Sequence, residues 1–130
     1  MTSETMKTKP NLVDWYIELQ EEHETKYGKR TIVMMEVGKF YECYAVTEEQ
    51  WERLHAACVA LDLHLTRKNN KTAEGVAVTS GNPHMSGFPS IAFDKYMTRL
   101  VAHGYCVVRV DQITGPPTPR REVTRVYSPS

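Results

Sequence analysis

The stretch from Thr31 to Ala45 constrains the fold of this chain more than any other part of the sequence. Residues 31–37 form a mostly apolar, β-favouring run, which is typical of a central strand. Gly38 and Lys39 then turn or bulge the chain into a second extended segment at residues 40–45. The sequence therefore predicts two consecutive strands at this point of the chain.

Helical and extended patterns alternate along the rest of the chain. Apolar spacing and capping residues predict three helices, which run from Asn11 to Gly28, from a capping box at Thr47 to residue 61, and from Ser90 to Gly104. Further strands are expected at residues 63–66, 76–79, 105–110 and 122–127, whereas residues 80–89 are expected to be a loop because they include two glycines and two prolines. This alternation predicts a mixed α/β fold, in which a mixed β-sheet of about five to six strands is packed by about three helices.

Composition sets the outer limits of the interpretation. A length of 130 residues suits one domain, and 41% hydrophobic with 25% charged residues is typical neither of a disordered chain nor of a membrane protein. The first thirty residues lack the apolar core of a secretory signal. We expect residues 1–10 to be a flexible lead-in and residues 11–130 to form the domain. The three cysteines form no CxxC pair, which favours reduced thiols in an intracellular protein.

The net charge is zero, but the charges are unevenly distributed along the chain. Residues 1–61 carry 7 basic and 11 acidic side chains, a net charge of −4, whereas residues 62–130 carry 9 basic and 5 acidic side chains, a net charge of +4. The second half could therefore supply a basic face for nucleic acid. The alternative is that both sets of charges belong to ordinary solvated surface.

The sequence contains none of the common enzyme motifs. It has no GxxxxGK[ST] phosphate loop, no GxGxxG, no HExxH and no Cys/His spacing typical of a metal site. Cys43 could act as a nucleophile only if a base activated it, and no sequence feature identifies one. We therefore expect Cys43, Cys58 and Cys106 to be small core residues, and no metal to be bound.

Phe40 and Glu42 form the most distinctive candidate site. A β-strand sends alternate side chains to the same face, so the two would project together, roughly 7 Å apart. An apolar wedge beside a hydrogen-bonding acid suits prying apart a base stack and testing a base. The alternative is that Phe40 caps the core and Glu42 is an ordinary polar surface residue. Tyr44 would share their face, whereas Cys43 and Ala45 on the opposite face are better suited to close packing, which leaves the Phe40 face freer to lie at a surface.

Five segments resemble, in the same order, parts of the mismatch-recognition domain (domain I) of MutS-family DNA mismatch-repair proteins. Residues 38–42, Gly-Lys-Phe-Tyr-Glu, match the reader motif of that family, Gly-x-Phe-Tyr-Glu. The other similar segments are residues 61–68, 86–93, 104–112 and 121–126. Together the resemblance covers about residues 11–130. The Gly-Lys form of the reader, with Ser-Gly-Phe-Pro at residues 86–89, looks most like the eukaryotic mismatch-reading subunit.

The resemblance implies that the chain reads mismatched DNA. Phe40 would wedge into the duplex from the minor groove and stack on a mispaired or unpaired base, and Glu42 would hydrogen-bond the displaced base. A mismatch resists such kinking less than a matched pair, because it has already lost pairing and stacking. Contacts to the DNA backbone are assigned to residues near the reader motif and near the segment 61–68, namely Lys39, Thr66, Arg67, Lys68 and Lys71. The alternative for the basic residues among them is an ordinary solvated turn.

The resemblance also implies what lies outside this chain. Full-length family members are dimeric ATPases, so ATP and Mg²⁺ would belong to other domains, and this chain is expected to have no cofactor and no enzymatic activity. The expected partners are double-stranded DNA with mismatches or small loops, other MutS domains and a MutS-type dimer partner. No membrane association is expected. The expected location is inside the cell, with DNA. The alternative function is a protein-interaction or scaffold module of a repair assembly that keeps the fold without reading bases.

Overall fold

The structure, a computed structural model, describes residues 11–69 and 75–129. Its elements in chain order are α2 (Leu12–Tyr27), β1 (Thr31–Val37), β2 (Phe40–Ala45), α3 (Glu48–Leu61), β3 (Thr66–Arg67), β4 (His84–Pro89), the 3-10 turn η2 (Ser90–Ala92), α4 (Phe93–Ala102), β5 (Cys106–Gln112) and β6 (Arg121–Tyr127).

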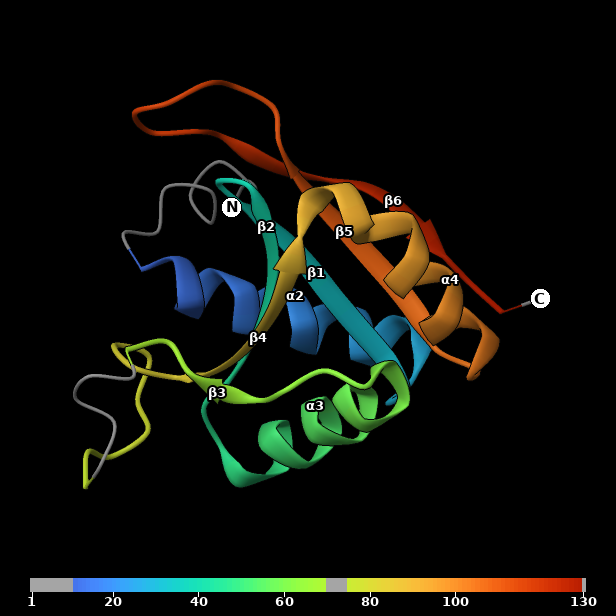
Figure 1. The fold of residues 1–130 in the computed structure, drawn as a ribbon, viewed down its shortest axis with the longest axis horizontal. Helices are drawn as coiled ribbons and strands as arrows, with labels where there is room; N and C mark the ends of the chain where they lie inside the picture. The colour runs from blue at the N-terminus through green and yellow to red at the C-terminus, as the bar shows by residue number, and fades with distance from the viewer. Residues whose placement is uncertain (1–10, 70–74, 130) are drawn as a thin grey trace.

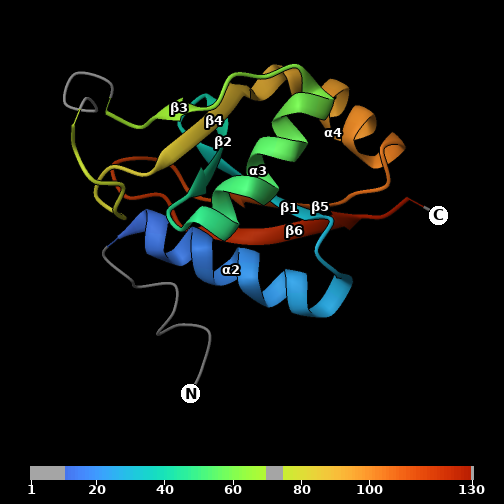
Figure 2. The same ribbon diagram turned by 90° about the horizontal axis from the view of Figure 1, so that it is seen from below.

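The six strands form one mixed sheet in the order β3-β4-β2-β1-β5-β6 (Figure 1). β1 and β5 are parallel, and the other neighbouring pairs are antiparallel. Helix α2 covers one face of the sheet, and α3 and α4 lie on the other (Figure 2). The predicted mixed α/β fold is therefore confirmed. Within the described part of the chain, no helix is both long and apolar enough to cross a bilayer.

The predicted ends of the first two helices are confirmed by their caps. The Asn11 side chain accepts hydrogen bonds from the amides of Val13 and Asp14, at 2.9 and 3.2 Å. At the other end of α2, Gly28 has a φ of 104°, which glycine adopts readily. Helix α3 begins with a capping box between Thr47 and Gln50.

The strand β4 is the largest departure from the sequence prediction, which expects a loop over residues 80–89. β4 pairs with β2 along its whole length. Gly87 fits there because it lies opposite Glu42, where a Cβ atom would come within 3.0 Å of the Tyr41 carbonyl oxygen. Pro89 is the last residue of the strand, where a missing amide is tolerated. Glycine and proline therefore mark close pairing and a strand end here, and not a loop.

Three smaller predictions also need correction. Residues 76–79, which the structure describes, form no strand, and Thr79 makes only an isolated bridge to Asn82. The short strand expected at residues 63–66 is displaced to β3 at Thr66–Arg67. Ser90 begins the turn η2 and does not cap α4, whose first residue is Phe93.

The central strand β1 is packed from both faces and gives the sheet a rigid base. Residues 32–35 are at most 3% exposed. On the α2 side, the Tyr16 hydroxyl donates to the Val33 carbonyl oxygen at 2.8 Å. The Gln20 side chain donates to the Thr31 carbonyl oxygen at 2.6 Å and accepts from the Val33 amide at 2.8 Å. Burying each large apolar side chain contributes about 1.5–3 kcal/mol, so β1, the strand that leads into the reader motif, is firmly anchored.

Candidate nucleic-acid interface

A two-residue turn joins β1 to β2 and ends at Phe40. Val37 pairs with Phe40, and Gly38 between them has a φ of 61°, in the left-handed region. A positive φ at the first of two turn residues is the pattern of a type II′ turn, which suits the twist of a hairpin. The Ser90 amide donates to the Lys39 carbonyl oxygen at 2.8 Å, so η2 also holds the turn. The turn, η2 and the loop between β5 and β6 lie at the same end of the molecule (Figure 1).

One face of β2 changes from exposed to buried within five residues. Phe40 is 47% exposed, the Glu42 side chain 16% and Tyr44 2%. Tyr44 lies under α2, where its ring meets the Tyr16 ring edge-on at 5.2 Å. The prediction that Phe40, Glu42 and Tyr44 share a face is confirmed. The prediction that this face is the freer one is confirmed at its Phe40 end, because Tyr41, Cys43 and Ala45 on the opposite face are at most 6% exposed, whereas α2 covers the Tyr44 end.

Two neighbours on the same face hold the Glu42 carboxylate. The Tyr44 hydroxyl donates a hydrogen bond to Oε1, and the Lys68 ammonium lies 3.6 Å from the same oxygen. Burial, followed by the hydrogen bond to Glu42, raises the pKa of Tyr44 far above its ordinary value, so the hydroxyl remains a donor at neutral pH. Gly87 pairs with Glu42 across the two strands, and a Cβ atom there would lie in ordinary contact with the Glu42 Cγ, at 3.5 Å. The carboxylate therefore has a fixed position beside Phe40.

The structure brings part of the predicted backbone-contact set to this face. Lys39 is exposed in the turn next to Phe40. Thr66 lies in the same row of the sheet as Tyr44, because both pair with Met85, and Lys68 reaches the face at Glu42. Lys71 lies outside the described residues. The structure thus assembles an aromatic ring, an acid and two lysines around one end of β2.

Arg67 has different surroundings. Its guanidinium donates hydrogen bonds of 2.9–3.1 Å to the backbone carbonyl oxygens of Val76, Ala77 and Asn82. These bonds fasten the segment before β4 to β3. A phosphate contact by Arg67 stays a prediction, and a phosphate would have to compete with these carbonyl oxygens.

The β5–β6 hairpin adds two residues, Gln112 and Arg121, which are paired in the strand register. The Arg121 Nε donates to the Glu36 carbonyl oxygen at 2.7 Å, although the two residues are 85 positions apart. Burial lowers the pKa of Arg121, and the nearby acidic groups of Tyr44, Glu36 and Glu42 partly offset this effect. The Arg121 guanidinium therefore reaches from the closing strand to the end of β1 and to Gln112. The closing strand is part of the site through a contact that no local sequence pattern reveals.

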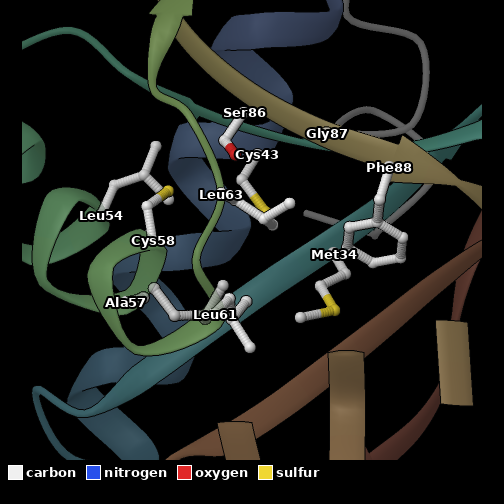
Figure 3. A pocket seen from close by; sticks show the side chains of 11 residues that line it. Met34, Cys43, Leu54, Ala57, Cys58, Leu61, Leu63, Ser86, Gly87 and Phe88 are labelled. Atoms are coloured by element: carbon white, nitrogen blue, oxygen red, sulfur yellow. The ribbon is translucent and has the colours of Figure 1, made fainter. Parts of the chain in front are cut away.

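Two of the three cysteines line a small apolar pocket between the sheet and α3 (Figure 3). Burial raises the pKa of both Cys43 and Cys58, so their thiols stay protonated and poorly nucleophilic at neutral pH. The prediction that the cysteines are core residues is confirmed for these two, whereas Cys106, the first residue of β5, is only half-buried. Over residues 11–69 and 75–129, no group of three His, Cys, Asp or Glu side chains could hold a metal ion.

Comparison with known proteins decides the family. The family model described as MutS domain I matches residues 11–130. The chain belongs to the MutS domain I family. It is 31% identical to a putative DNA mismatch repair protein mutS homolog of Acanthamoeba polyphaga mimivirus, over 93% of this chain and 11% of the relative. Two proteins named DNA mismatch repair protein MutS are also 31% identical to it, from Prochlorococcus marinus over 88% of this chain and 11% of the relative, and from Thermus thermophilus over 92% and 13%.

The chain therefore spans about a tenth of the length of these MutS relatives, at 11–13%. The resemblance drawn from the five sequence segments is confirmed. In this MutS domain I, the Gly-x-Phe-Tyr-Glu motif forms the turn and the exposed start of β2.

Proposed function

We propose that this MutS domain I recognises mismatched or looped duplex DNA, with Phe40 as the wedge and Glu42 as the base contact. The observation that supports this most is the 47% exposure of the Phe40 ring at the end of a hairpin whose base is buried. An exposed aromatic ring on a rigid mount, beside an oriented carboxylate, has the chemistry needed to enter a base stack.

Discrimination would come from the energy of deforming the DNA. Inserting the Phe40 ring unstacks a base step, which costs a few kcal/mol in an intact duplex. A mispaired or extra base has already lost part of that stacking, so the same insertion is easier. The bound ring then stacks on the displaced base, a contact available to any of the four bases.

Glu42 would supply the polar part of the recognition. Its carboxylate would hydrogen-bond the displaced base, whereas in matched DNA no displaced base is present and the carboxylate meets only phosphate repulsion. Lys68, 3.6 Å from Oε1, would soften this repulsion. Backbone contacts would come from Lys39, Thr66, Lys68 and, less directly, Arg67 and Lys71. We propose that other MutS domains and a MutS-type dimer partner complete the assembly, inside the cell and with DNA.

A low-salt DNA-binding titration tests the proposal. The 130-residue chain would be titrated with a matched duplex, a single mismatch and a one-base loop, and compared with its Phe40→Ala variant. Val59→Ala is the matched control, because Val59 is an apolar residue of α3 that is 68% exposed and lies away from the turn. We expect the wild type and Val59→Ala to prefer the mismatch and the loop.

Phe40→Ala is expected to lose this preference while keeping weak, salt-sensitive binding to every duplex. Equal binding of all three duplexes by the wild type would contradict the proposal. Failure of the wild type to bind any duplex would instead favour the interaction-module function, in which the fold is kept without reading bases.

A further inference from the structure

The peptide unit of Gly38 is held by one side chain from a distant hairpin. The Gly38 amide donates to Gln112 Oε1 at 2.9 Å, and Gln112 Nε2 donates to the Gly38 carbonyl oxygen at 3.1 Å. A side-chain amide thus satisfies both the donor and the acceptor of one turn residue, 74 positions away. This paired geometry fixes the orientation of the turn as well as its position.

Gln112 is itself fixed by its surroundings. Its backbone amide donates to Glu36 Oε1 at 2.9 Å, and Arg121 Nη2 donates to Gln112 Oε1 at 3.2 Å. Arg121 also reaches back to the Glu36 carbonyl oxygen at 2.7 Å. The end of β1, the end of β5 and the start of β6 are therefore joined in one hydrogen-bond network, with Gln112 at its centre.

The turn that this network steadies is exposed, and it is also held by the Ser90 amide, which donates to the Lys39 carbonyl oxygen. Gly38 has a φ of 61°, Lys39 is exposed, and Phe40 exposes 47% of its surface. A wedge that must unstack bases transmits force to its turn, and a loose turn would let the ring swing aside. Holding functional groups to within about 0.5 Å requires a supporting layer of hydrogen bonds behind them.

We infer that Gln112 is a positioning residue for mismatch reading, which locks the β1–β2 turn so that Phe40 meets the DNA as a rigid wedge. The inference rests on the proposed function of Phe40. Gln112 acts through the Gly38 peptide and not through contact with a base. The network predicts that its loss weakens discrimination between mismatched and matched DNA more than it weakens binding to matched DNA.

Amide hydrogen exchange tests this directly, because the Gly38 amide donates to Gln112. In Gln112→Ala, and in Gln112→Met, which keeps the length of the side chain, we expect Gly38 to exchange about tenfold faster. Thr114→Val is the matched control, since Thr114 Oγ1 accepts a 2.7 Å bond from the Arg120 amide within the β5–β6 loop and not from the turn. Amides of β1 and β5 report whether each variant keeps its fold.

The same variants would then be titrated with matched and mismatched duplexes. We expect both Gln112 variants to lose about three- to tenfold in mismatch preference, with affinity for matched DNA and all properties of Thr114→Val unchanged. Unchanged Gly38 exchange, or faster exchange with full mismatch preference, would overturn the inference. If the wild type itself shows no preference, the proposed function fails, and Gly38 exchange still decides whether Gln112 locks the turn.

Discussion

The two ends of β2 carry aromatic side chains on the same face under opposite conditions. Tyr44 is 2% exposed, lies against the Tyr16 ring at 5.2 Å and fastens the strand to α2. Phe40, four residues earlier, is 47% exposed. Both side chains lie on the same face of β2, but helix α2 covers Tyr44 and does not cover Phe40. The proposed reading surface therefore lies where α2 ceases to cover a strand that is otherwise part of the core.

Glu42 lies between these two ends and links them. Its carboxylate accepts from the buried Tyr44 hydroxyl and lies beside the exposed Phe40. The buried Tyr44 thus positions the Glu42 carboxylate, which would act together with the exposed Phe40 in reading the base. The following predictions test how separate the two ends are, from the largest expected effect to the smallest.

Truncating the two aromatic residues should separate stability from reading. Tyr44→Ala is expected to lower the free energy of unfolding by about 3–5 kcal/mol, because it leaves a cavity under α2. Phe40→Ala should change it by only about 0.5 kcal/mol, since the ring is largely exposed. Urea unfolding of both variants measures this difference. Similar losses in the two variants would show that Phe40 belongs to the core after all.

A methyl group at Gly87 should disturb the middle of the strand. In Gly87→Ala, the Cβ atom would lie 3.0 Å from the Tyr41 carbonyl oxygen, so β2 and β4 must separate slightly. We expect a loss of about 1–3 kcal/mol in the free energy of unfolding. Gly115→Ala is the matched control, because nothing lies within 4 Å of a Cβ atom there. Equal stability of the two variants would mean that the strand pair is more loosely packed than the structure shows.

Removing single hydroxyl groups should distinguish positioning from packing. Tyr44→Phe loses the donor to Glu42, and Tyr16→Phe loses the donor to the Val33 carbonyl oxygen. Each change is expected to cost about 1 kcal/mol of stability. Only Tyr44→Phe should also lower the preference for mismatched over matched DNA, by about threefold to tenfold. An equal loss of mismatch preference in Tyr44→Phe and Tyr16→Phe would show that Tyr44 acts through stability alone.

The local patterns of the sequence predict much of this fold. The apolar run that becomes β1, the start of β2 at Phe40 and the caps at Asn11 and Thr47 depend on neighbouring residues, so they can be read directly. β4 cannot be read this way. Its glycine and proline indicate a loop locally, and only the close approach of β2 explains Gly87.

The candidate site also has one part that the sequence predicts and one part that it does not. The Phe40 and Glu42 pair follows from strand alternation and from the resemblance to the MutS family. The supports of that pair come from other elements: Lys68 after β3, Gln112 at the end of β5 and Arg121 at the start of β6. These contacts depend on strand order and register, which a single sequence does not specify.

Fluorine NMR would test most directly whether the exposed end of β2 reads the base. The chain has three phenylalanines, of which Phe88 and Phe93 are 3% and 2% exposed, so all three can be replaced by 4-fluorophenylalanine with two buried internal references. We predict that saturating mismatched duplex shifts the Phe40 resonance through the ring current of a stacked base, that matched duplex does not, and that both references stay in place. An unshifted Phe40 signal in the bound mismatched complex, or the same shift with matched DNA, would contradict the wedge.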